Sequence, residues 1–370
     1  MDKNYVKDER VVMTLDAGGT NFVFSAIRGG IQVTPPYHLP AVTDDLEGCL
    51  HQLVEGFRYV KSHCPAAPSA ISFAFPGPAD YVHGVIGNLP NFECFQGGVA
   101  MGGFLEEEFG IPVFINNDGG LFAYGEAMAG GLPTVNKWLA KRGSNTVYRN
   151  LVGITLGTGF GCGIVINNQL LLGDNGQAGN IWCFRNKKHP QLIAEESVSI
   201  RAVCRVYHES CDDPRELTPK DIADIAHGKA EGNREAALRS FKELGEVAGD
   251  AIAMTCGIVD GIVVIGGGLA RSSDLIFPSM VSEMNSTLGM SGQRSVNRLP
   301  VKVYNLDTAD GLEAFLNEEI TTVNIPGTDK QVPYRVAGHI GVMRSPLGAS
   351  NAITHGAYLY ALAQLDANTE

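Results

Sequence analysis

The chain begins with two apolar runs that a short polar turn separates. Residues 11–15 and 22–27 are mostly apolar, and between them the sequence reads DAGGTN. Apolar runs of this length predict buried strands, and glycines between them predict a tight turn, so we expect a β-hairpin. The same design returns at residues 151–173, where the turn reads LGTGFG. Two hairpins of one design predict two domains that share a topology.

Helical spacing of apolar side chains marks the segments around these hairpins. It predicts helices over residues 46–62, 119–130, 232–256 and 351–365. A third glycine turn, GGGLA at residues 266–270, follows a buried strand and precedes a helical pattern at 272–285. Strands that alternate with helices predict an α/β protein. The last helix is apolar on one face, and we expect it to fold back onto the first domain.

Two stretches interrupt this pattern. Residues 137–150 are basic and rich in turn formers, and residues 308–334 are polar without clear periodicity. We interpret both as surface insertions and assign them no chemistry.

Composition narrows the setting. The 370 residues are 44% hydrophobic, which is enough for two domains with their own cores. The net charge is -12 and Lys and Arg form no dense run, so we expect no nucleic-acid partner. The apolar runs are too short to span a membrane, and the first ten residues lack the apolar segment of a secretory signal. Eight scattered cysteines without a C-x-x-C pair favour reduced thiols, so we predict a cytoplasmic protein.

The glycine turns are candidates for phosphate binding. A turn without bulky Cβ atoms exposes consecutive backbone N–H groups, and a concave row of such donors binds anions. Asp16 would repel a phosphate unless a cation lies between them, and Mg²⁺ is the cation that phosphate oxygens and one carboxylate share best. An ordinary hairpin turn is the alternative for residues 16–19, but the second copy at 157–159 favours a nucleotide-phosphate clamp.

Other phosphate-binding motifs fit less well. The sequence has no G-x-x-x-x-G-K-[ST] motif. Residues 266–271 match part of the dinucleotide fingerprint, but Arg271 stands where its last glycine belongs. An NAD-dependent oxidoreductase is therefore a minor alternative.

Taken together, these motifs resemble the ROK family, which contains sugar kinases and sugar-responsive repressors. The resemblance covers nearly the whole chain and rests on short motifs in the family's order: LDAGGTN at 15–21, FPGP at 75–78, ND at 117–118 with GE at 125–126, TLGTG at 155–159, GGGLA at 266–270 and GASNA at 348–352. It implies two ribonuclease-H-like domains of the actin-like ATPase fold that flank a cleft. The implied small domain comprises residues 1–121 and 352–370, and the implied large, nucleotide-binding domain comprises residues 122–351.

The resemblance also implies roles for single residues. Asp118 would be the general base of phosphoryl transfer, although an aspartate before a helix is often only an N-cap. ATP and Mg²⁺ are the implied cofactors, with Asp16 holding the metal through the nucleotide. The implied nucleotide-binding residues are Asp16, Gly18, Gly19, Thr20, Asn21, Gly157, Thr158, Gly159, Gly266, Gly267 and Gly268.

Sugar recognition is where this sequence departs from the family. The implied sugar-binding residues are Asn91, Asn117, Asp118, Asn180, Cys183 and Glu195. Asn180 stands where family glucokinases have a Glu, and Cys183 stands where they have a His, so a charge-assisted contact is lost. The family's cysteine-rich zinc motif is also missing after this segment, so we predict no zinc site.

The resulting expectation is an ATP-dependent hexose kinase that converts glucose to glucose 6-phosphate. A sugar-responsive regulator is an alternative, although only fifteen residues precede Asp16 and leave no room for a DNA-binding domain. A catalytically weak sugar-binding protein is a second alternative. The family resemblance also implies a homo-oligomer, a dimer.

Overall fold

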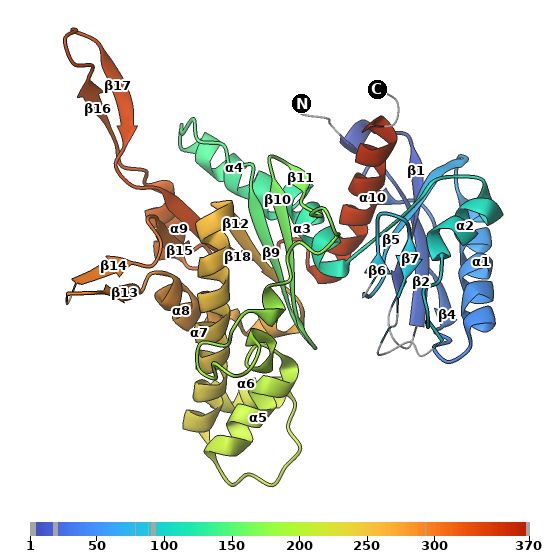
Figure 1. Cartoon of the computed structure of the whole chain (residues 1–370), viewed down its shortest axis with the longest axis horizontal. Coiled ribbons are helices and arrows are strands. Elements are labelled where there is room, and N and C mark those ends of the chain that lie inside the picture. Colours follow the sequence, from blue (N-terminus) through green and yellow to red (C-terminus); the bar gives the residue numbers. More distant parts are fainter. Residues whose placement is uncertain are drawn as a thin grey trace. The chain divides into compact units, whose positions relative to one another are not determined.

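The computed structural model describes residues 5–17, 21–77, 79–87, 89, 94–292 and 294–367. The chain divides into two compact units, each with helices around a mixed sheet (Figure 1). The first unit comprises Met1–Ala129, Gln169–Ala178 and Leu347–Glu370, and the second comprises Gly130–Asn168 and Gly179–Pro346. This architecture confirms the predicted α/β class. The predicted boundaries at 121/122 and 351/352 concern functional domains and stay a prediction.

The sheet of the first unit has the strand order β3-β2-β1-β5-β8, and β4 also pairs with β2. Its strands are β1 (Val11–Ala17), β2 (Asn21–Arg28), β3 (Ile31–Gln32), β4 (Tyr37–Pro40), β5 (Pro68–Ala74) and β8 (Val113–Asn116), and β6 (Ala79–Asp80) and β7 (Val85–Ile86) form a separate ladder. β1 and β2 are antiparallel, as the hairpin pattern predicted. β1, β5 and β8 run parallel, so their carboxyl ends meet at one edge of the sheet.

Helices flank this sheet. They are η1 (Tyr5–Lys7), α1 (Leu46–His63), α2 (Met101–Phe109), α3 (Asp118–Met128) and α10 (Ala349–Ala367), and a short strand β11 (Gln169–Leu170) belongs to the same unit. α10 packs on α3, β5 and β1, which confirms that the last helix returns to the first domain. Glycines allow the two helices to touch, because a Cβ at Gly125 would lie 2.0 Å from the Ala352 carbonyl oxygen and one at Gly356 would lie 1.9 Å from that of Leu121.

The sheet of the second unit contains the strands β10-β9-β12-β18-β15 in this order. Their bounds are β9 (Leu151–Leu156), β10 (Phe160–Ile166), β12 (Ile262–Gly266), β15 (Lys302–Asn305) and β18 (His339–Arg344). β9 and β10 are antiparallel, whereas β9, β12, β18 and β15 run parallel. This hairpin repeats the design of β1 and β2, as the sequence predicted.

The helices of the second unit build its core against this sheet. They are α4 (Gly131–Lys141), η2 (Ile181–Cys183), η3 (Ala194–Glu196), α5 (Ile200–Ser210), α6 (Pro219–Ala226), α7 (Arg234–Val259), η4 (Gly268–Ser272), α8 (Ser273–Met284) and α9 (Ala309–Leu316). α7 is buried along most of its length, where Phe241, Leu244 and Ile252 pack in the core. Gly245 and Gly249 bring α7 close to the backbone of α8.

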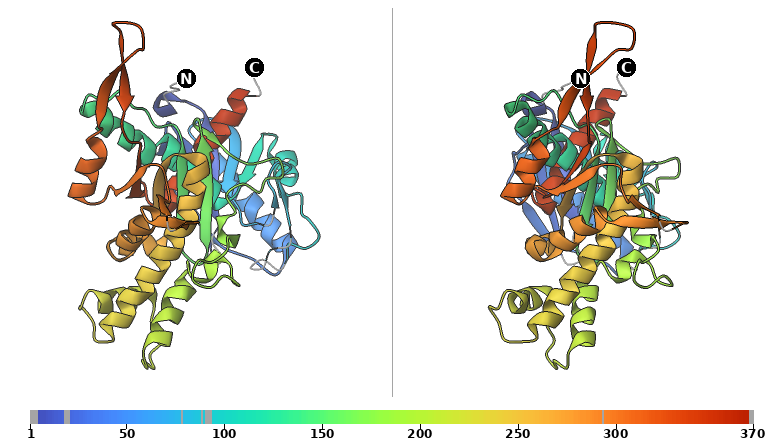
Figure 2. Two further views of the ribbon diagram at one scale, coloured as in Figure 1. Left: turned by 60° about the vertical axis from the view of Figure 1, so that its left-hand side comes forward. Right: turned by 90° about the vertical axis from the view of Figure 1, so that its left-hand side faces the viewer.

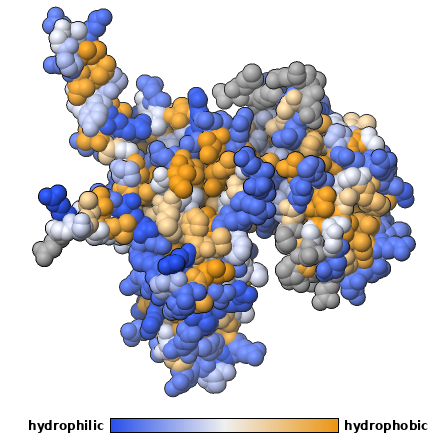
Figure 3. All heavy atoms as spheres, in the orientation of Figure 1, coloured by the Kyte–Doolittle hydropathy of each residue, from blue (hydrophilic) through white to orange (hydrophobic). Residues whose placement is uncertain are grey.

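Two hairpins extend from the second unit: β13 (Thr287–Met290) with β14 (Arg294–Asn297), and β16 (Ile320–Asn324) with β17 (Gln331–Arg335). Both views in Figure 2 show β16 and β17 projecting from their unit, and apolar residues are visible on this hairpin in Figure 3. The β16–β17 hairpin and α9 occupy most of the 308–334 stretch, and the end of α4 lies in the 137–150 stretch. Among the described residues, no helix is both long enough and apolar enough to cross a bilayer.

Candidate active site

Two carboxylates mark the carboxyl edge of the first sheet. Asp16 lies near the end of β1, and Asp118 follows the end of β8. β5 separates these strands, so the two positions are about 10 Å apart along the sheet by strand spacing. The structure therefore brings together, within one unit, the residues for which the sequence predicted metal and base chemistry.

Asp118 is the first residue of α3, and the helix cap is its neighbour. The Asn117 side-chain oxygen accepts hydrogen bonds from the N–H groups of Gly119 at 2.9 Å and Gly120 at 3.4 Å. Asn117, and not Asp118, is therefore the N-cap of α3. Asp118 accepts one bond, from the N–H of Gly119 at 2.9 Å, and its side chain remains exposed to solvent. The surrounding protein raises the pKa of this carboxyl by desolvation, and that backbone bond partly offsets the rise.

Asp16 is exposed, and its carboxylate forms no hydrogen bond or ion pair with any residue that the structure describes. Desolvation by the surrounding protein raises its pKa. An unpaired carboxylate in a partly desolvated position suits a cation, because a nearby positive charge favours the ionised form. Asn21 is exposed at the start of β2. The predicted residues Gly18, Gly19, Thr20 and Asn91 lie outside the described residues.

Tyr81 interacts with Asn117 and Asp118, and the sequence analysis did not identify it. Its hydroxyl donates to the Phe75 carbonyl at 2.9 Å. Burial raises the pKa of Tyr81 to about 12, a hydrogen bond with the Asn117 side chain lowers it, and the charge of Asp118 raises it. The phenol therefore stays protonated at neutral pH and supports the turn that begins α3. No spacing in the sequence connects Tyr81 with residues 117–118.

In the second unit, two predicted glycine turns lie side by side. The 157–159 turn joins β9 to β10, and the 266–268 turn ends the adjacent parallel strand β12, where Gly266 pairs with Thr155. Gly267 has φ +89°, and a Cβ there would lie 2.2 Å from the Leu156 carbonyl oxygen, so only glycine fits. Thr158 is exposed, and its hydroxyl has no partner among the described residues. The two turns thus form one stretch of backbone whose N–H groups are not covered by bulky side chains.

Glu195, a predicted sugar-binding residue, contacts this stretch of backbone. One carboxylate oxygen accepts the N–H of Phe160 at 2.9 Å, directly after the 157–159 turn. A Cβ at Gly159 would lie 2.7 Å from the same oxygen, which explains the glycine. Asn180 precedes η2, and Cys183 is its last residue. The Trp182 indole N–H donates to the Asn180 side-chain oxygen at 2.8 Å, and the Cys183 thiol donates to the Asn180 carbonyl at 3.0 Å. These local bonds orient the segment that carries both departures from the family pattern.

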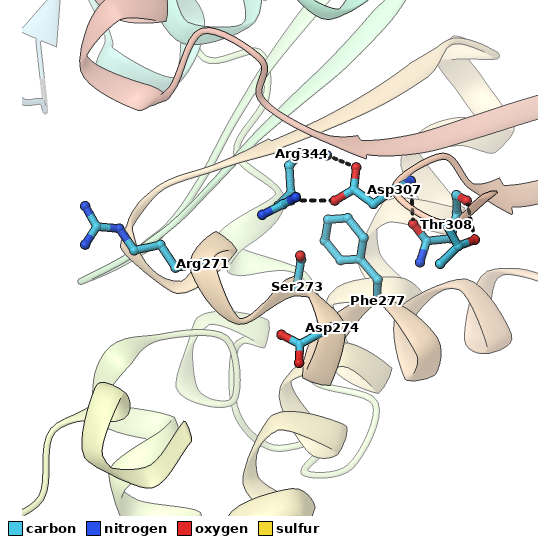
Figure 4. A pocket seen from close by; sticks show the side chains of 8 residues that line it. Arg271, Ser273, Asp274, Phe277, Asp307, Thr308 and Arg344 are labelled. Atoms are coloured by element: carbon cyan, nitrogen blue, oxygen red, sulfur yellow. Dashed lines mark hydrogen bonds and ion pairs between the residues drawn. The ribbon is translucent and has the colours of Figure 1, made fainter. Parts of the chain in front are cut away.

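A pocket lies beyond the 266–268 turn, at the carboxyl ends of β12, β15 and β18 (Figure 4). Its volume is about 180 Å³, and it is open to solvent. Its lining residues are Arg271, Ser273, Asp274, Phe277, Asn305, Asp307, Thr308 and Arg344. The Arg344 guanidinium bonds Asp307 at 2.6 Å, and Phe277 forms an apolar wall. The sequence analysis missed these residues, because they come from three separate segments and form no motif.

In the described part of the chain, no group of three or more His, Cys, Asp and Glu side chains is placed to hold a metal ion.

The sequence and the fold match those of known proteins. A sequence profile of the ROK family matches residues 12–311. The solved glucokinase of Parabacteroides distasonis is 54% identical with a TM-score of 0.90, and the alignment covers 97% of this chain and 99% of that one. The curated glucokinase of Streptomyces coelicolor is 25% identical over 71% of this chain and 83% of its own length. The fold is also that of a Streptomyces griseus ROK glucokinase solved with glucose and AMPPNP, at 18% identity and a TM-score of 0.59 over 94% of this chain and 98% of that one.

Proposed function

Because this chain belongs to the ROK family, we propose that it is an ATP-dependent hexose kinase that converts glucose to glucose 6-phosphate. The observation that carries the proposal is the 54% identity to the Parabacteroides distasonis glucokinase over nearly the full length of both chains. Asp16 and Asp118 at one sheet edge of the first unit, and the two adjacent glycine turns in the second, support the same chemistry.

Asp118 is the proposed general base. As the sugar hydroxyl attacks the γ-phosphorus, its proton passes to the Asp118 carboxylate. A bond forms between the hydroxyl oxygen and phosphorus, and the bond to the bridging oxygen breaks to release ADP. The raised pKa supports this role, because a carboxylate with a higher pKa is a stronger base. Its exposure supports it too, because a substrate can reach the group.

The nucleotide phosphates have two proposed cradles. In the second unit, the backbone of the 157–159 and 266–268 turns and the Thr158 hydroxyl donate to phosphate oxygens. In the first unit, residues 16–21 form the other cradle, and Asp16 holds Mg²⁺ through the nucleotide. The metal supplies positive charge that neutralises the phosphates. The pocket beyond residue 268 is the proposed site of the nucleoside, with Phe277 as its apolar wall.

The sugar-binding residues are proposed from both units. Asn91, Asn117 and Asp118 come from the first domain, and Asn180, Cys183 and Glu195 come from the second. Because Asn117 already caps α3 with its oxygen, its contribution to sugar binding is limited to its amide N–H group. We further propose that the functional domains follow the predicted boundaries, that the protein works in the cytoplasm, and that it forms a homo-oligomer.

The first experiment measures ADP release with Mg-ATP and a panel of glucose, mannose, fructose, N-acetylglucosamine, N-acetylmannosamine and allose. We expect turnover on glucose and a loss on the order of 10²- to 10⁴-fold for Asp118→Asn, because the variant keeps the shape of the side chain and lacks the base. Glucose affinity, measured by calorimetry, is expected to stay within a few-fold. Full activity in Asp118→Asn would show that another group is the base. Glucose binding without turnover in the unsubstituted protein would favour the weak sugar-binding alternative.

A further inference from the structure

We infer that Asn186 is a positioning residue for the proposed reaction, because it holds Glu195 against the 157–159 turn. This inference rests on the proposed function, in which Glu195 binds sugar and the turn binds phosphate. It concerns one connected segment of the second unit, residues 184–200.

Asn186 is fully buried and uses its whole amide. Its side-chain oxygen accepts the N–H groups of Lys188 at 2.9 Å and His189 at 3.0 Å. Its side-chain nitrogen donates to the Ile193 carbonyl at 3.2 Å and to the Ser197 hydroxyl at 2.9 Å. A buried amide with four bonds fixes its surroundings strongly, because each bond lost leaves a polar group without a partner.

These bonds close a small loop. The N–H of Asn186 donates to the Leu192 carbonyl at 3.0 Å, and the N–H of Ala194 donates to the Phe184 carbonyl at 2.7 Å. The backbone on the two sides of the loop is therefore joined by hydrogen bonds. The Asn186 side chain adds bonds to residues inside the loop and to residues that follow it. Glu195 follows this closure directly, so its backbone position depends on the loop.

The same segment is joined to the phosphate turn at two points. Glu195 accepts the N–H of Phe160 at 2.9 Å, and the N–H of Ile200 donates to the Gly157 carbonyl at 2.9 Å. Ser197, which receives a bond from Asn186, in turn donates to a Glu243 carboxylate oxygen of α7 at 3.3 Å. The loop is thus anchored to the core on one side and to the turn on the other, with Asn186 between them.

An aspartate cannot replace this asparagine. It has nearly the same shape and keeps both acceptor contacts, but it has no N–H to offer the Ile193 carbonyl or the Ser197 hydroxyl. Its carboxylate would face the carbonyl oxygen at close range, and the loop would have to open. Glu195 would then lose its fixed place beside Phe160.

Asn186→Asp tests the inference against a matched control, Asn285→Asp. Asn285 also bridges backbone segments, because its amide donates to the carbonyls of Val281 and Val303 and accepts the N–H of Val303, yet it lies at the end of α8. Ser197→Ala is a milder second variant that removes one partner of Asn186. The measurements are KM and kcat for glucose, the Kd of AMPPNP, the thermal midpoint, and hydrogen exchange of peptides that cover residues 157–160.

We expect Asn186→Asp to raise the KM for glucose by about tenfold to a hundredfold. The Kd of AMPPNP rises by less, because Glu195 loses its place while the phosphate turn loses only one of its supports. Hydrogen exchange at residues 157–160 rises. Ser197→Ala raises the KM for glucose and this exchange by less than Asn186→Asp does. Asn285→Asp lowers the thermal midpoint without either change. Unchanged glucose KM and unchanged exchange in folded Asn186→Asp, or in Ser197→Ala if the first variant does not fold, would overturn the inference. If the unsubstituted protein turns over no hexose, the proposed function fails, and the exchange result alone decides the role of Asn186.

Discussion

At the start of α3, one residue caps the helix and its neighbour carries the carboxylate proposed as the base. Asn117 satisfies the free N–H groups of the first helical turn, which leaves Asp118 with a single backbone bond and an exposed carboxylate. Had Asp118 been the cap, its oxygens would be tied to the helix and its pKa would be lowered by those bonds. The order Asn-Asp therefore keeps the second side chain available for a substrate.

The raised pKa of Asp118 predicts an acid limb in the pH profile. Only the ionised carboxylate accepts a proton, so kcat/KM falls as pH is lowered through this raised pKa, tenfold per unit below it. The profile should be measured with glucose varied at saturating Mg-ATP. A profile that stays flat down to the pKa of an ordinary aspartate would contradict the assignment.

The same shift has a consequence for stability. Because folding raises this pKa, the ionised carboxylate opposes folding above it, and stability from this group increases as pH falls through the interval between the unfolded and folded values. Asp118→Asn is therefore expected to unfold at the same or a higher temperature than the unsubstituted protein at pH 7. This thermal midpoint serves as the control that its loss of turnover does not come from unfolding.

Much of the candidate site was readable from the sequence because glycine and aspartate at strand ends form compact motifs. The roles of Asn180 and Cys183 were harder to foresee. The contacts of Asn180 with the Trp182 indole and the Cys183 thiol depend on the backbone of one short 3₁₀ turn. Tyr81 and Asn186 were missed for a related reason, since each acts through residues that no motif connects to it.

At the scale of elements, the contact between α3 and α10 depends on two glycines. Gly356→Ala places a Cβ 1.9 Å from the Leu121 carbonyl oxygen, so the helices must move apart. We expect the free energy of unfolding to fall by about 1–3 kcal/mol, as for other overpacked sites. Denaturant unfolding measures this change.

Gly103→Ala is the matched control for that substitution. Gly103 lies inside α2, and a Cβ there meets no atom within 4 Å. We expect the control to be neutral or to stabilise by up to about 1 kcal/mol, because alanine favours the helix. Equal losses in both variants would show that the close approach of α3 and α10 does not explain the effect.

α1 and α7 are among the helices that the sequence predicted, because burial over many turns leaves a periodic trace. The shorter α5 and α6 were not predicted, although each also buries apolar residues on one face. The hairpins β13–β14 and β16–β17 left no such trace. Their strands are four or five residues long and exposed on both faces, so no buried face imposes a pattern on the sequence.

At the scale of the whole molecule, the β16–β17 hairpin is the candidate contact between subunits of the proposed homo-oligomer. Val323 pairs directly with Val332, and Thr321 pairs with Tyr334, so these side chains share one uncharged face of the hairpin. Val323, Val332 and Tyr334 are each more than 40% exposed. An exposed apolar face of this kind marks an interaction surface, and a two-stranded hairpin is marginally stable without one.

We therefore expect Val323→Lys combined with Val332→Lys to reduce the mass measured by light scattering from that of an oligomer to that of one chain. Ile320→Lys is the control, because Ile320 pairs with Arg335 on the opposite face of the hairpin and is equally open to solvent. An unchanged mass in the double variant would exclude this face as the interface. Turnover per chain should remain, since none of the proposed catalytic residues lies on this hairpin.

The return of α10 to the first unit has a consequence for the order in which the protein is made. The ribosome releases residues 1–129 long before it reaches residue 347, yet α3, β5 and β1 need α10 to cover them. At about 5–20 residues per second, this interval lasts roughly ten to forty-five seconds. During this interval the surface of the first unit that α10 covers is exposed, while the second unit is being synthesised. The nascent chain should therefore depend on a chaperone in this window, and a message truncated before residue 349 would yield a protein whose second unit is complete and whose first unit never closes.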